Sequence, residues 1–359
     1  MKTFARETYR VIQWATGHQG ANAIGMIASG NRPHLELVGC WVNAKEKVGL
    51  DAGEIAGVGH LGVEATDDEA ALLELDADCI VYSGFWSNID LICRMLAAGK
   101  SVVTQVGPVY LRDGRRKAQI QDACQQGGTS FHAAGINTGF FSDRLCASLT
   151  ALNGAVEHIS CVEYAHDSVA GLSDYMVFEA MGFGWSEERL AAEQPALFAS
   201  LNDSAMFAGG DFVAAALGFE IDRRESGHRF AMATQDLNLR DRVVRAGTVG
   251  AVATTYRMFT GATERLRYAQ AWRIDPALDT GWGYDAHPKA FYQIEVRGTP
   301  SYTVLWEPDG DGMADALYAT AATVVNAIPF VCDAPPGIHT TVDLPMISFS
   351  GNLRARSRS

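Results

Sequence analysis

The chain has 359 residues, of which 48% are hydrophobic and 20% charged, a composition typical of a folded protein long enough for two domains. Its 29 basic and 42 acidic residues give a formal charge of −13, which argues against binding to nucleic acid or to an anionic membrane surface. Because no apolar run approaches the roughly 18 residues that a transmembrane helix needs, we expect no membrane span, and the polar residues 1–10 do not resemble a secretory signal.

The cysteines give no sign of a disulfide framework or a metal cluster. No two of them form a CxxC motif, and most lie in apolar runs, where a free thiol behaves as a small hydrophobic side chain. The seven are Cys40, Cys79, Cys93, Cys124, Cys146, Cys161 and Cys332. We therefore predict no metal site and a reducing compartment, the cytoplasm.

The first part of the chain alternates short apolar runs with helical patterns. Strands are predicted at residues 9–14, 35–42, 79–82, 101–105 and 129–132, and helices at 21–29, 67–75, 88–98 and 115–126. Strand alternating with helix at this spacing predicts an α/β fold with a doubly wound parallel sheet. We assign residues 1–152 to this Rossmann domain.

The pattern changes after residue 152. Strands are predicted at residues 159–165, 230–239, 248–259, 266–274 and 291–296, and helices at 185–200 and 205–219. They predict an α+β domain, residues 153–310, built on an open antiparallel sheet with one solvated face. Because such a sheet needs its apolar face covered, we expect a homodimer. Residues 311–359 begin with a helix at 312–328 and are expected to return to the Rossmann domain.

A glycine-containing turn follows the first predicted strand. Residues 15–20, Ala-Thr-Gly-His-Gln-Gly, match the dinucleotide fingerprint with alanine in its first glycine position. Gly17 would let the backbone approach a pyrophosphate, and Gly20 would let the helix pack closely on the strand. The free N–H groups at the helix start, where His18 and Gln19 lie, would face the phosphates. The alternative is a purely structural turn.

The end of the second predicted strand bears on the choice of cofactor. Enzymes specific for NAD place an acidic residue there to bind the ribose 2′-hydroxyl. This chain has Asn43, with Lys45 and Lys47 just beyond it. A neutral side chain beside two ammonium groups favours a 2′-phosphate, so we predict NADP(H) as the preferred cofactor, with NAD(H) also accepted. The alternative is a solvated loop with ordinary lysines.

Three segments carry a resemblance to a known group of proteins. Residues 11–20, 45–53 and 324–337 resemble the bacterial reductases related to dihydrodipicolinate reductase and 2,4-diaminopentanoate dehydrogenase, a group that also contains the native amine dehydrogenases. The resemblance implies a Rossmann domain and a second α+β domain that supplies the substrate pocket and a dimer contact. It also implies hydride transfer between NAD(P)H and a C=N or C=O carbon.

Two departures from that family pattern matter. The segment that carries a glutamate in amine dehydrogenases reads Thr-Gln-Val-Gly-Pro-Val-Tyr here, at residues 104–110, and contains no carboxylate. The family's Gly-Asn-Pro-Gly turn corresponds to residues 135–139, with Thr138 in the proline position. From the first departure we expect reduction of a carbonyl, or of a preformed neutral imine, to outrun amination from free ammonia.

Ligands of a doubly wound sheet bind beyond the carboxyl ends of the strands. That rule selects Ser83, Gly84 and Phe85, which follow the third predicted strand, with the first two against the cofactor ribose. It also selects Gln105 and Gly107, which would lie near the nicotinamide.

Four residues are candidates for the chemistry itself. His132 is the first candidate proton donor, although a histidine in a buried strand is often a core residue. Tyr110 is the competing acid. Asn137 would bind the carboxamide or the substrate, or else only shape its loop. The resemblance suggests Asn326 as a carboxamide partner, with a polar helix-end residue as the alternative.

The substrate pocket is expected to contain four more residues, although an aromatic stripe at helical spacing is also typical of a core: Phe140, Asp174, Tyr175 and Phe178. We predict an NAD(P)H-dependent reductase acting on the C=O or C=N carbon of a mainly apolar small molecule. The alternative is a dinucleotide-binding sensor or structural protein that catalyses no reaction.

Overall fold

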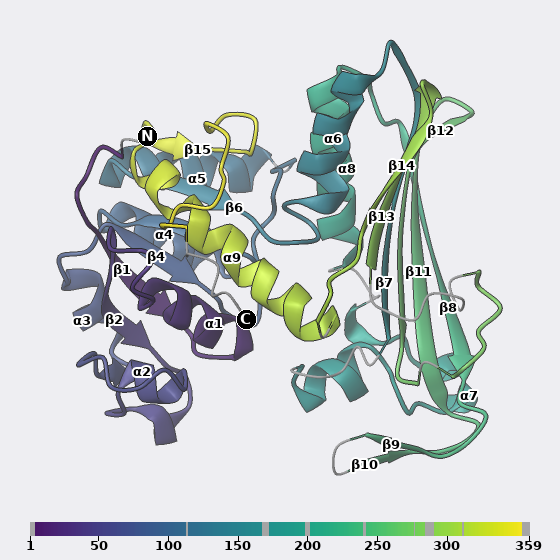
Figure 1. The fold of residues 1–359 in the computed structure, drawn as a ribbon, viewed down its shortest axis with the longest axis horizontal. Helices are drawn as coiled ribbons and strands as arrows, with labels where there is room; N and C mark the ends of the chain where they lie inside the picture. Colours follow the sequence, from purple (N-terminus) through teal and green to yellow (C-terminus); the bar gives the residue numbers. More distant parts are fainter. Residues whose placement is uncertain are drawn as a thin grey trace. The chain divides into compact units, whose positions relative to one another are not determined.

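The computed structural model describes residues 4–112, 114–166, 172–197, 202–239, 242–275, 277–283, 291–310 and 312–353. The chain divides into two compact units. Figure 1 colours the chain by position in the sequence, from purple at the N-terminus to yellow at the C-terminus. Unit 1 contains Met1–Phe140 and Leu317–Ser359, and unit 2 contains Phe141–Ala316. The boundaries expected from the sequence lay after residues 152 and 310.

Unit 1 is built on a parallel sheet of seven strands in the order β15-β6-β5-β4-β1-β2-β3. The strands are β1 (Tyr9–Trp14), β2 (Leu35–Trp41), β3 (Ala65–Thr66), β4 (Cys79–Tyr82), β5 (Ser101–Thr104), β6 (Ser130–Ala133) and β15 (Gly337–Ile338). The predicted Rossmann fold is confirmed. The strand order changes direction between β1 and β4, so a crevice for ligands is expected where these two strands end.

Helices cover both faces of this sheet. α1 (His18–Ile27) and the part of α9 (Gly312–Cys332) that belongs to unit 1 pack on one face, against Val11 and Val81. α3 (Glu69–Glu74), α4 (Ile89–Ala97) and α5 (Gly114–Gly127) pack on the other, against Ile12 and Ile80. Successive apolar residues of a strand point to opposite faces, which explains the continuous apolar runs in the sequence.

The helix α9 bears on the expectation that the chain has no membrane span. By length and composition it is the one helix among the described residues that is long and apolar enough to cross a membrane. Several of its apolar residues, including Val324, Val325 and Ile328, are fully buried in the core of unit 1. Packing in that core accounts for the apolar character of the helix.

Unit 2 contains a six-stranded sheet in the order β14-β13-β7-β12-β11-β8. The strands are β7 (Ala155–His166), β8 (Arg223–Met232), β11 (Val249–Thr260), β12 (Thr263–Arg273), β13 (Phe291–Thr299) and β14 (Tyr302–Trp306). β7 and β12 run parallel, so the prediction of a wholly antiparallel sheet is wrong for this pair. The strands of the hairpins β11–β12 and β13–β14 are antiparallel because a short turn joins them. β7 and β12 are separated in the chain by helices and by other strands, so no turn dictates their relative direction.

The predicted strand at residues 230–239 is split in two. Its first part ends β8, and its second part is β9 (Leu237–Leu239), which pairs with β10 (Arg242–Val244) outside the main sheet. The predicted helix at residues 185–200 is the shorter α7 (Glu187–Ala192), and residues 198–200 lie outside the described part of the chain.

α6 (Cys146–Leu149) and α8 (Asn202–Leu217) stand along one face of the unit 2 sheet in Figure 1. α8 approaches β11 closely at Gly210, where a Cβ would lie 2.1 Å from the sulfur of Met258 and would displace that side chain. Phe207 packs edge-on against Tyr256, with ring centroids 5.7 Å apart. We call this the helix-covered face.

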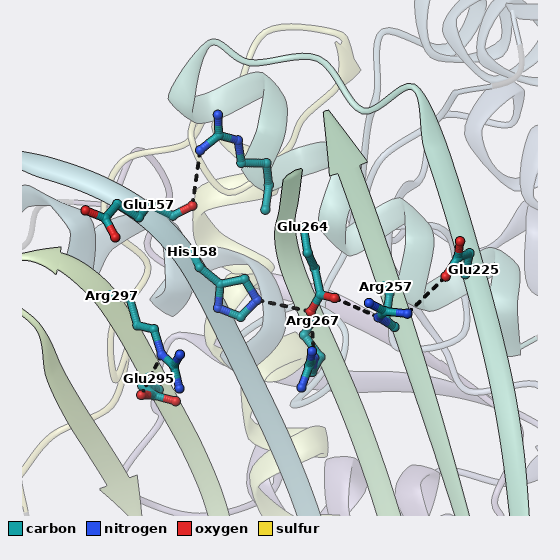
Figure 2. A network of polar contacts seen from close by, with 9 residues as sticks. Glu157, His158, Glu225, Arg257, Glu264, Arg267, Glu295 and Arg297 are labelled. Atoms are coloured by element: carbon teal, nitrogen blue, oxygen red, sulfur yellow. Dashed lines mark hydrogen bonds and ion pairs between the residues drawn. The ribbon is translucent and has the colours of Figure 1, made fainter. Parts of the chain in front are cut away.

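The opposite face of the unit 2 sheet carries the network of ion pairs in Figure 2. Glu264 accepts hydrogen bonds from Arg257 Nε and Arg267 Nε, each 2.6 Å long, and lies 3.3 Å from His158 Nε2. The side chain of Glu264 is only 13% exposed. Burial alone would raise its pKa, but the two arginines outweigh burial and lower the pKa to about 2.

We expect Glu264→Gln to destabilise the protein by roughly 1–3 kcal/mol, between the values typical of exposed and of buried ion pairs. Because the folded-state pKa lies below the ordinary value of 4.5, the contribution is complete above pH 4.5 and is lost as the pH falls toward 2. Thermal unfolding should show a gap between variant and wild type that closes over this range. Glu295→Gln, which removes a pair with Arg297 alone, is the matched control. An equal loss in both variants would contradict the prediction.

Candidate functional site

The turn between β1 and α1 has the geometry of a nucleotide-binding turn. Ala15, in the first glycine position of the fingerprint, has a φ of +73°, a conformation that costs a non-glycine residue about 1–2 kcal/mol. The side-chain amide of Gln13 donates to the Ala15 carbonyl at 2.9 Å and so holds the turn. A Cβ on Gly20 would lie 2.0 Å from the same carbonyl oxygen. Only glycine at position 20 lets α1 begin this close to β1.

The polar groups around the turn fit a dinucleotide. A Cβ on Gly17 would have no neighbour within 4 Å, and α1 begins without an acidic residue or a side-chain cap. Among the described residues, the buried side-chain oxygens of Gln19 and Gln105 accept no hydrogen bond. Open helix N–H groups suit phosphates, and buried amide groups of this kind usually have a partner, which a bound ligand would supply.

The loop after β2 separates the two predicted lysines. Lys47 lies at the turn, with its amine 3.2 Å from the carbonyl oxygen of Thr16. Lys45 forms an exposed ion pair with Asp67, and Asn43 is exposed. Of the three residues, only Lys47 contacts the nucleotide-binding turn among the interactions of the described residues.

One buried carboxylate organises this loop, and the sequence analysis missed it. Asp51 accepts hydrogen bonds from five backbone N–H groups, those of Gly53, Glu54, Leu61, Gly62 and Val63. Burial would raise the pKa of Asp51, but these N–H groups lower it to about 2. The carboxylate thus fixes residues 51–63, the segment that follows Lys47.

The residues after β4 also come to the turn. Ser83 Oγ accepts a hydrogen bond of 3.1 Å from Gln13, and the Ser83 N–H donates to the Trp14 carbonyl. Gly84 follows, and a Cβ there would lie 2.5 Å from the hydroxyl of Tyr82. Phe85 is 48% exposed. The structure therefore brings Ser83 and Gly84 together with the β1–α1 turn.

The segment after β5 contains the closely packed Gly107 and two partly exposed residues, Gln105 and Tyr110. A Cβ on Gly107 would lie 2.8 Å from Thr104 Cγ2 and 3.2 Å from the ring of Phe131, so a larger residue there would have to displace its neighbours.

His132 lies in the core. It is fully buried in β6, and its Nδ1–H donates to the carbonyl oxygen of His339 at 2.8 Å. That bond ties β6 to the residues after β15. The placement favours the structural alternative, because a general acid must reach a substrate.

The structure places Asn326, the predicted carboxamide partner, away from the nucleotide-binding turn. Its side-chain oxygen accepts hydrogen bonds from Arg32 and from the backbone and hydroxyl of Ser350. Arg32 lies beyond the C-terminal end of α1, whereas the nucleotide-binding turn precedes the N-terminal end. A helix of ten residues is about 15 Å long, so Asn326 lies near the end of α1 that is farther from the turn.

Asn137 lies in a tight turn after β6. Gly135 and Gly139 have φ values of +145° and +118°, and a Cβ on Gly139 would lie 2.3 Å from the Gly135 nitrogen. The peptide bond between Asn137 and Thr138 is cis. Both glycines are required by the backbone, and Asn137 is partly exposed between them.

A row of polar side chains crosses the helix-covered face of unit 2. Its members are directly opposite one another on adjacent strands and therefore share a face. From β14 to β8 they are Trp306, Tyr292, Glu163, Gln270, Thr254 and His228. On the same face, apolar residues flank this polar row on both sides: Cys161, Tyr268 and Tyr256 on one side, and Ala165, Trp272 and Val252 on the other.

Glu163 is the charged member of this polar row. Gln270 Nε2 donates to its carboxylate at 2.9 Å and Trp272 Nε1 at 3.0 Å, and Tyr292 also contacts it through a side-chain hydrogen bond. The sequence analysis missed this residue, although a signal exists. In residues 159–165, Glu163 is in phase with Ile159, Cys161 and Ala165, which places a carboxylate on the buried side of a strand.

Comparison with known proteins adds to this geometry. The family model for the C-terminal domain of 2,4-diaminopentanoate dehydrogenase matches residues 140–357. The chain belongs to the 2,4-diaminopentanoate dehydrogenase and amine dehydrogenase-like family. The resemblance seen in the sequence is confirmed, and the chain is an NAD(P)-dependent oxidoreductase. This family membership replaces the alternative of a protein that catalyses no reaction.

Individual relatives agree with the family. An amine dehydrogenase of Streptomyces virginiae is 28% identical over 95% of this chain and 98% of its own. The structure of an amine dehydrogenase from Mycobacterium smegmatis matches with a TM-score of 0.79 at 18% identity, over 98% of this chain and all of that one. Myo-inositol dehydrogenase from Lactobacillus casei, solved with NAD(H) and myo-inositol, matches with a TM-score of 0.52 at 14% identity, over 94% and 90% of the two chains. The last two show the fold.

The four residues predicted for the substrate pocket differ in their burial and in their contacts. Asp174 forms an ion pair of 3.3 Å with Arg242, and Tyr175 is 48% exposed. Phe178 packs against the apolar cluster that contains Trp272, and the guanidinium of Arg242 lies 4.6 Å above its ring. Phe140 is the last residue of unit 1. The π-helical segment η4 (Tyr175–Ala180) thus has one apolar side in the core and one polar side.

The described part of the chain contains no candidate metal centre. Among the described residues, no three histidine, cysteine, aspartate or glutamate side chains are grouped so that they could hold a metal ion.

Proposed function

We propose that this oxidoreductase is an NAD(P)H-dependent reductase that transfers hydride to the C=O or C=N carbon of a mainly apolar small molecule. The observation that carries the proposal is the fit of the Ala15–Gly20 turn to a dinucleotide: glycine is required at position 20, and α1 begins without a cap.

We assign the following roles to residues of unit 1. The N–H groups at the start of α1 would bind the phosphates, and Gln105 and Asn137 would hold the carboxamide. A bound nicotinamide supplies the hydride. Tyr110 is our choice for the proton donor, because its phenol is partly exposed after β5 and can donate a proton to a reacting oxygen or nitrogen.

The test is oxidation of NADPH and NADH, followed by absorbance, with a panel of ketones, aldehydes and preformed imines. We expect turnover with at least one medium-sized apolar member. Tight binding of the cofactor without turnover of any member would overturn the proposed substrate class.

We propose NADP(H) as the preferred cofactor, with Lys47 as the residue that reads the 2′-phosphate. Its amine lies at the nucleotide-binding turn, whereas Lys45 is engaged with Asp67. Lys47→Ala should raise the dissociation constant of NADPH about tenfold, with a smaller effect on NADH. Lys45→Ala is the matched control and should change neither. Equal losses for both cofactors in Lys47→Ala would show that this lysine does not read the phosphate.

We also propose a homodimer formed through the charged face of the unit 2 sheet. Leu305, on the edge strand β14, is 50% exposed, and the ion pairs around Glu264 present both signs of charge. A surface that carries both signs of charge can pair with its own copy about a two-fold axis. Light scattering at micromolar concentration should give twice the monomer mass of 38.7 kDa, and a monomer mass would reject the proposal.

A cytoplasmic location completes the proposal. Its support is the apolar setting of the cysteines, five of which are buried, since such thiols persist in a reducing compartment.

A further inference from the structure

A buried amide side chain lies at the base of the nucleotide-binding turn. Gln13 is in β1, opposite Cys40 and Val81 on the two neighbouring strands, and is 0% exposed. An apolar residue at this position would continue the core, whereas a buried amide must recover in hydrogen bonds what it loses in hydration. The polar side chain therefore needs a reason other than packing.

The contacts of Gln13 fix the orientation of its amide. The amide nitrogen lies 2.9 Å from the carbonyl oxygen of Ala15, 3.1 Å from Ser83 Oγ and 3.3 Å from the carbonyl oxygen of Trp14. Because a carbonyl oxygen only accepts hydrogen bonds, the nitrogen and not the oxygen of the amide must face these groups. The amide oxygen is buried and accepts no hydrogen bond among the described residues, so the side chain serves here as a donor.

The turn needs such a donor because alanine occupies the first glycine position of the fingerprint. Ala15 has a φ of +73°, in the left-handed region that glycine adopts freely and alanine does not. The free energy of one hydrogen bond is of the same order as the cost of that conformation. A Cβ on Gly20 would lie 3.0 Å from the amide nitrogen of Gln13, so the start of α1 packs directly on this amide.

Ser83 extends the contact from one strand end to another. β1 and β4 are the strands between which the strand order changes direction, and ligands of a doubly wound sheet bind where these strands end. The turn with Ala15 follows β1, and Ser83 follows β4. One side chain thus holds the segments that follow both strands.

We propose that Gln13 is a positioning residue of the cofactor site: its amide holds Ala15 in the conformation that the fingerprint assigns to glycine, and fixes Ser83 beside it. This inference rests on the proposed function, since it concerns how the turn binds the dinucleotide. It explains how this chain keeps a nucleotide-binding turn with alanine in the first glycine position. Gln13 acts through the backbone of the turn.

A double-mutant cycle on NADPH affinity, measured by calorimetry with the full-length protein, tests the proposal. Gln13→Met, which keeps the length of the side chain and removes the donor, should weaken binding at least about tenfold. Ala15→Gly alone should change the affinity less than about twofold, because the turn is already held. The double variant should return to within about threefold of wild type, because glycine adopts the left-handed conformation without help.

Gln121→Met is the matched control for this cycle. The side-chain amide of Gln121 also bonds to the backbone of unit 1, but it accepts from the N–H of Ile338 on β15, away from the turn. Its loss should leave NADPH affinity unchanged. A double variant of Gln13 and Ala15 that binds as weakly as Gln13→Met would overturn the role of Gln13, as would full affinity in Gln13→Met itself.

Kinetics and hydrogen exchange separate positioning from a general loss of structure. Gln13→Met should raise KM for NADPH at least about tenfold and leave kcat at saturating cofactor within about twofold. In the protein without cofactor, it should speed exchange of the Ala15 amide, which bonds to the Trp41 carbonyl, and of the Ser83 amide, and leave α5 as protected as in wild type. Unchanged exchange at both amides would overturn the inference.

The outcomes also distinguish this inference from the proposed function. Binding of NADPH without turnover of any carbonyl or imine would overturn the proposed function, whereas the affinity cycle would still decide the role of Gln13. If wild type bound no NADPH, the exchange measurement would decide whether Gln13 holds the turn. A Gln13→Met protein that folds only together with Ala15→Gly would support the inference, and failure of both variants to fold would show that Gln13 serves the core and overturn it.

Discussion

Replacing Gly20 with alanine is expected to weaken cofactor binding by a factor of at least about ten, or 1.4 kcal/mol. The added Cβ would lie 2.0 Å from the Ala15 carbonyl oxygen and 3.0 Å from the side-chain amide of Gln13. Contact with a backbone carbonyl cannot be relieved by a side-chain rotation, so α1 must move away from β1. The N–H groups at the start of the helix then move away from the phosphates.

The control for this substitution lies on the same helix. A Cβ on Gly25 would meet only Val58, at 3.4 Å, so Gly25→Ala should leave cofactor affinity unchanged and favour the helix slightly. Cofactor affinity is measured by titration with NADPH, after circular dichroism has shown that each variant is folded. A folded Gly20→Ala protein with unchanged affinity would show that this turn does not bind the pyrophosphate.

Tyr110→Phe is expected to lower kcat by roughly 10²–10⁴, the usual contribution of a general acid. The substitution removes only the hydroxyl, so KM and the affinity for cofactor should change little. Loss of kcat without loss of binding is the signature of a group that acts in the transition state. Steady-state kinetics with the best substrate of the panel provide the measurement.

His132→Gln tests the competing assignment. Since His132 is fully buried and donates to the carbonyl of His339, its replacement should lower the unfolding temperature and leave kcat nearly unchanged in the folded variant. The assignment of Tyr110 fails if the folded His132→Gln protein loses kcat by the larger factor, or if Tyr110→Phe keeps full activity.

The sequence alone was sufficient for unit 1. Runs such as Tyr9–Trp14 and Cys79–Tyr82 are apolar on both faces because helices cover both sides of a parallel sheet, and the predicted strands match those observed. β3 and β15 were not predicted, since a strand of two residues has no periodicity to detect. The role of Gly20 was also predictable, because the requirement for close packing is local to one turn.

Long-range geometry decided the remaining features. Asn326 was expected near the nicotinamide, but the course of α9 along the sheet places it beside Arg32, and no local pattern encodes that course. Likewise, the parallel pairing of β7 with β12 joins segments separated by about a hundred residues in the chain. Sequence patterns reveal which face of an element is apolar, not which partner covers it.

The same distinction applies to the candidate site. The sequence by itself determined the doubly wound sheet, the β1–α1 turn and the family, because the strands, the turn and the segments that carry the resemblance each have a pattern that is local to a short stretch of the chain. Only the tertiary structure assigned Lys47 rather than Lys45 to the turn and buried His132. It alone brought Glu163 together with Gln270 and Tyr292. A row of polar side chains across six strands depends on strand register, which is set by pairings between distant parts of the chain and not by the composition of any one strand.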